Sequence, residues 1–298
     1  MDALVLAGGK EKPYGLELTT DAAYPIEGRS MLAHVIDAVA GTGKFRRIVV
    51  VGDQEATAEK IPGVIWLTPE LSLSDNLKKG LEATEDADYV LVTSADIPLV
   101  TPDAITKFLA QCADSNGDIY YPIIAREVFA NTSLAAQRTF LMLRDGEFTG
   151  GNMALVRPQA ILNRMTLVQK VLEMRKNPVY WGKLLGWPFF VKALTAGVSI
   201  KEIERRVKRR FGLTGVAIVS DSLGIGLDAD SEEDLGWIRF YWGVEKEGCT
   251  AGNYERLKAL LTELEAHLRN GEIRSARVEV ELLPNGLGGI HVKTEPTS

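Results

Sequence analysis

Residues 2–9 read Asp-Ala-Leu-Val-Leu-Ala-Gly-Gly, an apolar run that ends in two glycines. A continuous apolar run suits a strand that is covered on both faces, as in a parallel sheet. Glycines at the carboxyl end of such a strand let backbone N–H groups approach a ligand, because no Cβ atom stands in the way. Ligands of open α/β sheets bind beyond the carboxyl ends of the strands. The stretch predicts a buried strand from Ala3 to Ala7 and a nucleotide at Gly8 and Gly9; a plain turn is the alternative.

Strand and helix signals alternate through the first 112 residues. Strands are expected over 47–51, 64–67 and 89–93, and helices over 31–40, 54–60, 75–84 and 103–112. Ser30 and Ser74 are the expected N-caps of two of these helices, and Pro102 suits the start of another. This alternation predicts right-handed βαβ units and a mostly parallel sheet.

The second half of the chain has a different pattern. Strands are expected over 118–124, 148–156 and 217–220, nearly continuous helix over 158–212, an amphipathic helix over 254–269, and a hairpin of 278–282 with 289–292. We therefore expect a three-layer, doubly wound α/β domain over 1–243, interrupted by a helical insert at about 158–213. A small α+β appendage, a helix plus a β-hairpin, is expected over 244–298.

Composition narrows the class of protein. The chain has 298 residues, 46% of them hydrophobic, which is ample for a large core. Its formal net charge of -6 argues against nonspecific nucleic-acid binding. Cys112 and Cys249 stand in no metal-binding or redox spacing, which is typical of a reducing compartment. The apolar stretch 178–200 is too interrupted for a membrane span, and no basic signal-peptide start is visible, so we expect a cytoplasmic protein.

Two acidic positions stand at sites suited to metal binding. Asp96 follows the buried strand 89–93 and should lie on the same sheet edge as Gly8. A carboxylate there can bind Mg²⁺, which takes one or two protein carboxylates plus phosphate oxygens. The alternative is that Asp96 caps a helix or orders its own turn. Asp228-x-Asp230 precedes Ser231, and an ordinary helix start is the alternative there. Asp230 with Asp96 would make a two-carboxylate metal site.

Five motifs together resemble those of MobA-like NTP transferases, in the same order. They are Leu6-Ala7-Gly8-Gly9, Pro25-Ile26-Glu27-Gly28-Arg29-Ser30-Met31-Leu32, Ser94-Ala95-Asp96-Ile97-Pro98-Leu99, Gly150-Gly151-Asn152, and Asp228-Ala229-Asp230-Ser231 before Glu233-Asp234-Leu235. This group includes molybdenum-cofactor guanylyltransferases and sugar-1-phosphate nucleotidylyltransferases. The resemblance covers roughly 1–157 and 214–243 and implies a nucleotide-diphospho-sugar transferase-like fold.

The resemblance also implies a chemistry. An acceptor oxygen would attack the α-phosphorus of a nucleoside triphosphate and release pyrophosphate, with Mg²⁺ held by Asp96 and Asp230. The base and ribose would lie over Leu6, Ala7, Gly8 and Gly9 and beside Ser74 and Asn76. Gly150, Gly151 and Asn152 would line the side of a small, phosphorylated acceptor.

The loop after the first glycines departs from the family pattern. Residues 13–28 contain no lysine or arginine, so Lys10 and Lys12 are the candidates for contact with the β- and γ-phosphates. Solvated surface lysines are the alternative. Two other functions stay open: a non-catalytic nucleotide-binding or regulatory relative, and a nucleotide-sugar-dependent glycosyltransferase with Asp228-x-Asp230 as its metal pair.

Two features of the helical insert also have alternatives. The basic helix 201–210 is interpreted as solvated charge, with a phosphate-bearing acceptor or an acidic membrane surface as the alternatives. The aromatic residues of 181–190 are expected to pack within the insert, or else to line an acceptor pocket or a homodimer contact.

Overall fold

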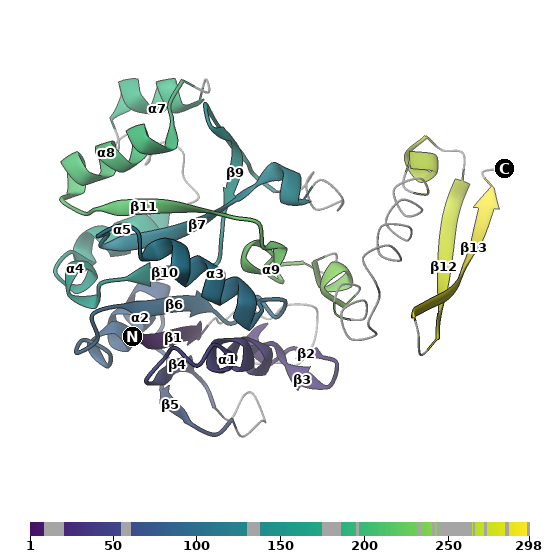
Figure 1. The fold of residues 1–298 in the computed structure, drawn as a ribbon, viewed down its shortest axis with the longest axis horizontal. Coiled ribbons are helices and arrows are strands. Elements are labelled where there is room, and N and C mark those ends of the chain that lie inside the picture. Colours follow the sequence, from purple (N-terminus) through teal and green to yellow (C-terminus); the bar gives the residue numbers. More distant parts are fainter. Residues whose placement is uncertain are drawn as a thin grey trace. The chain divides into compact units, whose positions relative to one another are not determined.

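The parallel half of the central sheet is built around β1 (Asp2–Ala7). β1 lies between β4 (Ile48–Gly52) and β6 (Val90–Ser94) and pairs with both in the parallel direction. The side chains of β1 are almost entirely buried, because helices cover both faces of the sheet at this point (Figure 1). The buried strand predicted from residues 2–9 is therefore confirmed.

The computed structural model describes most of the chain. The described residues are 1–8, 21–54, 61–129, 138–174, 186–194, 197–231, 234–239, 242, 264, 266–270, 273–283 and 286–296. Nearly all of the helix predicted over 54–60 lies outside them.

Within these residues, nine strands form one mixed sheet in the order β5-β4-β1-β6-β10-β7-β9-β8, with β11 paired to β7. The remaining strands are β5 (Val64–Leu67), β7 (Ile119–Ala125), β8 (Leu141–Leu143), β9 (Gly146–Gly150), β10 (Met153–Val156) and β11 (Gly215–Ser220). β5, β4, β1 and β6 pair in parallel, as do β7 and β11, whereas the pairs that involve β10, β9 and β8 are antiparallel. A separate small hairpin joins β2 (Pro25–Ile26) to β3 (Arg29–Ser30).

Helices pack on both faces of the sheet, which gives the three layers that the sequence predicts (Figure 1). α1 (Met31–Gly41) packs against α3 (Pro102–Cys112) on one face, and α2 (Leu73–Glu82) packs against α4 and α5 on the other. The other helices are α4 (Pro158–Leu162), α5 (Met165–Met174), α7 (Trp187–Leu194), α8 (Ile200–Phe211), α9 (Leu223–Gly226), η2 (Asp21–Ala23) and η3 (Arg126–Phe129). None of the described helices has the length and apolar character needed to cross a lipid bilayer.

Hydroxyl side chains cap the N-termini of α1, α2 and α3. Ser30 accepts a hydrogen bond from the N–H of Ala33, as predicted, and Thr101 caps α3 just before Pro102. The predicted cap of α2 is wrong: Ser72 has extended backbone angles and accepts from the N–H of Asp75. Ser74 instead lies within the first turn of α2, where it is buried.

The prediction of one continuous strand over 148–156 is also wrong, because two strands, β9 and β10, occupy this stretch. β9 and β10 both pair with β7, but the register shifts between them at Gly151 and Asn152. Gly151 donates its N–H to the carbonyl of Pro122, whereas Asn152 donates to Ile225 of α9. The interruption is a bulge-like break that turns the backbone of residues 151–152 toward α9.

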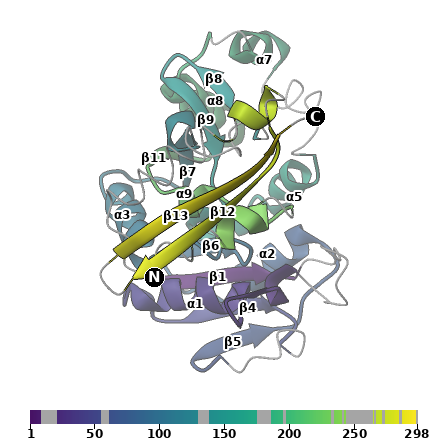
Figure 2. The same ribbon diagram turned by 90° about the vertical axis from the view of Figure 1, so that its right-hand side faces the viewer.

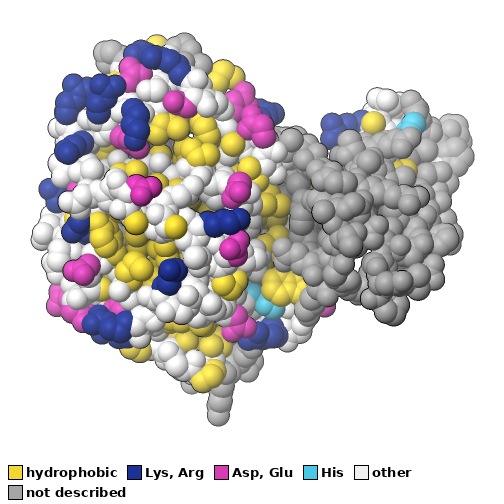
Figure 3. Space-filling view, viewed as in Figure 1, with side chains coloured by type: hydrophobic (Ala, Val, Ile, Leu, Met, Phe, Trp, Pro, Cys, Tyr) yellow, Lys and Arg dark blue, Asp and Glu magenta, His cyan; other side chains and the backbone are white. Residues whose placement is uncertain are grey.

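The basic helix predicted over 201–210 is α8. It begins with a capping box between Ser199 and Glu202 and ends at Gly212, whose φ of 64° suits glycine. Its exposed cations include Arg205, Lys208, Arg209 and Arg210. Figure 3 shows lysine and arginine side chains gathered over α8, whereas acidic and basic side chains are interspersed elsewhere on that face.

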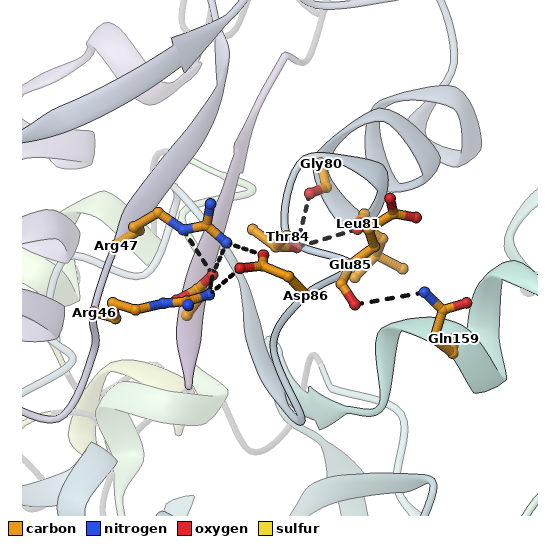
Figure 4. A network of polar contacts seen from close by, with 9 residues as sticks. Arg46, Arg47, Gly80, Leu81, Thr84, Glu85, Asp86 and Gln159 are labelled. Carbon is orange, nitrogen blue, oxygen red and sulfur yellow. Dashed lines mark hydrogen bonds and ion pairs between the residues drawn. The ribbon is translucent and has the colours of Figure 1, made fainter.

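Opposite charges hold the amino ends of β1 and β4 together (Figure 4). The side chain of Asp2 is fully buried and accepts hydrogen bonds from Arg46 and Arg47. The same two arginines pair with Asp86, in the connection between α2 and β6. The network therefore fixes the sheet edge opposite to the one where ligands are expected.

The chain divides into two compact units, Met1–Leu235 and Gly236–Ser298, a division that precedes the predicted boundary at 243. The described part of the second unit contains helical residues at 264 and 266–269. It also contains an antiparallel hairpin of β12 (Ile273–Leu283) and β13 (Gly286–Pro296), seen in Figure 2. The hairpin extends beyond the predicted strands at both ends. Most of the helix predicted over 254–269 and the turn at 284–285 lie outside the described residues.

Candidate functional site

The carboxyl ends of β1 and β6 lie side by side. Leu6 is in register with Ser94, and the N–H of Ala95 donates a 3.2 Å hydrogen bond to the carbonyl of Leu6. Gly8 follows β1 and Asp96 follows β6 on this edge. The sheet edge thus brings together two of the positions that the sequence singled out.

Gly8 lies against the start of α2. A Cβ atom at this position would approach the Nδ2 atom of Asn76 to 2.8 Å, so a side chain would displace that amide. The amide of Asn76 bonds the backbone of Glu70: Oδ1 accepts from the N–H at 2.6 Å, and Nδ2 donates to the carbonyl at 3.4 Å. Asn76 therefore fixes the connection that leads from β5 into α2, next to Gly8.

One carboxyl oxygen of Asp96, Oδ1, is buried without a hydrogen-bond partner among the described residues. Burial raises the pKa of Asp96 from 3.8 to about 6, and the charges of Asp228 and Asp230 act in the same direction against a smaller lowering by Ser94. An orphaned buried carboxylate oxygen is unusual and calls for an explanation such as an ion.

The loop after α9 is fastened beside Asp96. The N–H of Ala229 donates a 2.9 Å hydrogen bond to the backbone carbonyl of Asp96, which places Asp228 and Asp230 next to it. Asp228 forms an ion pair of 2.6 Å with Arg138. Sequence reasoning missed Arg138, because nothing in its local sequence distinguishes it from a surface arginine.

The carboxylates of Asp96 and Asp230 suit a magnesium ion whose other coordination positions are filled by water and by oxygens of a bound phosphate ligand. In the described part of the chain, no three acidic, histidine or cysteine side chains gather closely enough to hold a metal by themselves. Mg²⁺ characteristically takes only one or two protein carboxylates and fills its other positions with water and phosphate oxygens. The orphaned Oδ1 of Asp96 is a suitable first ligand, and Asp230 lies close enough to raise the pKa of Asp96.

The glycines predicted to line the acceptor side have two different roles. A Cβ atom on Gly150 would overlap the hydroxyl of Tyr121, whose side chain is 43% exposed. A Cβ atom on Gly151 would instead meet Ile225, Pro122 and Ile124 on the covered side of the sheet. Gly150 therefore lies under an exposed tyrosine, whereas Gly151 allows close packing.

Asn152 joins the antiparallel half of the sheet to this edge. Its backbone carbonyl accepts a 3.1 Å hydrogen bond from the N–H of Ser94. Its Nδ2 atom is buried and has no hydrogen-bond partner within the described residues. Asn152 thus brings a second orphaned polar atom to the end of β6. Gly9, Lys10 and Lys12 lie outside the described residues.

Comparison with known proteins decides the family. The model of the MobA-like NTP transferase domain matches residues 3–183. The chain belongs to this family. The resemblance drawn from the motifs is therefore confirmed, and the family is one of nucleotidyltransferases.

Two curated relatives match somewhat more than a third of this MobA-like protein. The bifunctional protein GlmU of Rhizorhabdus wittichii is 32% identical over 116 residues, which are 36% of this chain and 25% of GlmU. The 2-C-methyl-D-erythritol 4-phosphate cytidylyltransferase of Rhodococcus jostii is 31% identical over 113 residues, which are 37% of this chain and 50% of the relative. The matches thus span between a quarter and a half of the length of these relatives.

Solved structures match more of the chain. A hypothetical transferase from Thermus thermophilus is 31% identical with a TM-score of 0.69, over 78% of this chain and 98% of the other. A nucleotidyl transferase from Methanothermobacter thermautotroptrophicus is 16% identical with a TM-score of 0.50, over 81% of this chain and 96% of the other. The second likeness concerns the fold alone, and it agrees with the predicted fold class.

Proposed function

We propose that this MobA-like protein transfers a nucleotidyl group from a nucleoside triphosphate to a small, phosphorylated acceptor and releases pyrophosphate. The single observation that carries the proposal is the orphaned carboxylate oxygen of Asp96, beside Asp230 and on the edge that ends in Gly8. Asp96 and Asp230 would hold Mg²⁺, which would neutralise phosphate charge when bound.

The reaction makes few chemical demands on the protein. An oxygen of the acceptor phosphate forms a bond to the α-phosphorus, and the bond from that phosphorus to the pyrophosphate oxygen breaks. Such a transfer needs positioning and charge neutralisation rather than a protein nucleophile. An acceptor phosphate that is already ionised loses no proton, so no general base is required.

The remaining site residues have supporting roles in this proposal. The base and ribose lie over Leu6, Ala7 and Gly8, and at Gly8 no side chain stands between the backbone and the ligand. Ser74 and Asn76 order the neighbouring start of α2. We assign Lys10 and Lys12 to the β- and γ-phosphates, and Gly9 to the nucleotide together with Gly8.

The acceptor lies on the side of Gly150, Gly151 and Asn152. The exposed ring of Tyr121 over Gly150 offers an apolar surface, and Asn152 offers an amide donor. One curated relative is a cytidylyltransferase named for a methylated four-carbon polyol phosphate, which is a small acceptor of this kind. We place the reaction in the cytoplasm.

A second candidate is a nucleotide-binding protein without transferase activity. The specific observation in its favour is that residues 13–28 contain no lysine or arginine. The glycosyltransferase alternative has less support, because it needs Asp228 as a metal ligand and Asp228 is paired with Arg138.

Thermal unfolding with CTP, GTP, ATP or UTP, each with and without Mg²⁺, tests the proposal. A bound nucleotide raises the melting temperature by mass action. We expect one nucleotide to stabilise the protein only with Mg²⁺, and Asp96→Asn to lose that effect. Pyrophosphate release is then measured with a panel of sugar and polyol phosphates. Binding without release from any acceptor favours the non-catalytic candidate. Absence of Mg²⁺-dependent binding contradicts the transferase proposal, and absence of any nucleotide binding contradicts both.

A further inference from the structure

Arg138 forms an ion pair with Asp228, in the acidic loop beside Asp96. Its side chain is only 16% exposed, and its Nη2 atom lies 2.6 Å from Oδ1 of Asp228, which is itself 22% exposed. Nη1 donates to the backbone carbonyl of Gly226. The guanidinium also stacks over the buried ring of Phe129, at 5.1 Å from the ring centroid.

The position of the acidic loop does not depend on Arg138 alone. Leu227 donates its N–H to Leu223, Ala229 donates to Asp96, and Asn152 donates to Ile225 just before the loop. These backbone hydrogen bonds hold both sides of Asp228. Arg138 adds one thing that they cannot supply, a positive charge at the carboxylate of Asp228.

That charge matters because three aspartates share one small region. Asp228 and Asp230 both raise the pKa of Asp96, so the charge of each acts on the Asp96 carboxyl group. Two carboxylates balance the charge of one divalent cation, and an uncompensated third carboxylate at Asp228 would add a negative charge that faces the triphosphate. The guanidinium of Arg138 offsets the charge of Asp228.

We propose that Arg138 is a positioning residue that neutralises Asp228 and holds it aside, so that Asp96 and Asp230 bind a single divalent cation in a site that accepts an anionic nucleotide. This inference rests on the proposed function. It predicts opposite effects of removing Arg138: tighter binding of the cation to the nucleotide-free protein and weaker binding of the nucleotide.

The test measures Mn²⁺ binding to the full chain without nucleotide, by electron paramagnetic resonance. The variants are Arg138→Met, Asp228→Asn and the double variant. Removing one charge near a buried site changes the affinity for a divalent cation by about tenfold. We expect Arg138→Met to bind Mn²⁺ about tenfold more tightly and Asp228→Asn about tenfold more weakly. The double variant should return to the wild-type affinity, because its net charge at the site equals that of the wild type.

Arg126 provides a matched control. Its guanidinium also lies 5.1 Å from an aromatic ring, that of Phe140, and pairs with a carboxylate, Glu147, at 2.7 Å. Glu147 is not among the groups that shift the pKa of Asp96. Arg126→Met should therefore leave Mn²⁺ binding unchanged.

The second readout is nucleotide binding at saturating Mg²⁺. It is measured by the thermal shift that each of the four nucleoside triphosphates causes. Arg138→Met should lower the affinity, and Arg138→Lys should retain much of it because the charge remains. Equal Mn²⁺ affinities in wild type, Arg138→Met and Asp228→Asn would overturn this inference and leave the proposed function standing. If Arg138→Met does not fold, Asp228→Asn and the double variant still decide the question. No Mn²⁺ binding by wild type, with or without nucleotide, would overturn both proposals.

Discussion

The backbone N–H of Ala229 donates a 2.9 Å hydrogen bond to the backbone carbonyl of Asp96. This bond connects the loop after α9 to the end of β6, although the two segments are far apart in the sequence. Because it uses backbone atoms only, it sets the place of the acidic loop without engaging a carboxylate. The three aspartates can therefore be changed one at a time without removing this bond.

The pH dependence of stability is the first prediction, for protein without metal. Burial raises the pKa of Asp96 from 3.8 to about 6, so its protonated form favours the folded state. That contribution is complete below pH 4 and disappears as the pH rises through 6. Relative to Asp96→Asn, wild type should lose about 2–3 kcal/mol between pH 4 and pH 7. Urea unfolding in EDTA at several pH values measures this; parallel profiles for the two proteins would contradict it.

Asp2 should show the opposite pH dependence. Burial alone would raise the pKa of Asp2, but hydrogen bonds from Arg46 and Arg47 outweigh it and keep the pKa below 3.8. Its contribution is present above about pH 4 and is lost as the pH falls through the lowered value. Asp2→Asn should destabilise the protein by about 1–3 kcal/mol at pH 7, because two arginines lose a buried partner. The exposed Asp86→Asn, measured in the same denaturant series, is the control and should have a much smaller effect.

Gly80→Ala should destabilise the protein by about 1–3 kcal/mol, through overpacking. A Cβ atom at this position in α2 would overlap the methyl groups of Leu4 in β1, so the helix must move away from the sheet. The matched control is Gly236→Ala, in the helical stretch 234–239, where no described atom outside that stretch lies within 4 Å of the added Cβ. Alanine should be neutral or stabilising there, because it favours helix. Equal melting temperatures for the two variants would show that α2 does not pack as closely as described.

Gly150→Ala should impair acceptor binding, whereas Gly151→Ala should reduce the stability of the fold. At Gly150 the added methyl group displaces the exposed side chain of Tyr121, so the melting temperature should change little while the KM for the acceptor rises. At Gly151 it meets the packed side chains of Ile225, Pro122 and Ile124, and we expect a loss of about 1–3 kcal/mol in stability. Thermal unfolding and steady-state kinetics separate the two outcomes. A lower melting temperature for Gly150→Ala with an unchanged KM would place the acceptor elsewhere.

Local sequence predicts the elements of this fold well, because burial and capping are local signals. The run Ala3–Ala7, the Ser30 cap and the strand Val64–Leu67 follow from a few adjacent residues. The cap of α2 shows the limit of such signals. Ser74 was the expected cap, but the path of the chain leaving β5 puts Ser72, two residues earlier, in the extended conformation that a cap needs.

The candidate site was predictable only in part. The motifs marked Gly8, Asp96 and Asp230 as parts of one site, and the ends of parallel strands gave a reason for the first two to meet. The break at Gly151–Asn152 and the pairing of Arg138 with Asp228 were not predictable. Both depend on β7 and α9, which approach from distant parts of the chain.

The sequence by itself determined the α/β alternation, the buried first strand and the family, because short runs of adjacent residues are enough to indicate each of them. The tertiary structure decided which polar atoms lack a partner and which charges meet. Those properties arise from packing between distant segments: among the described residues, one carboxylate oxygen of Asp96 is left without a partner, and the charge of Asp228 is neutralised, only after β6, α9 and Arg138 come together.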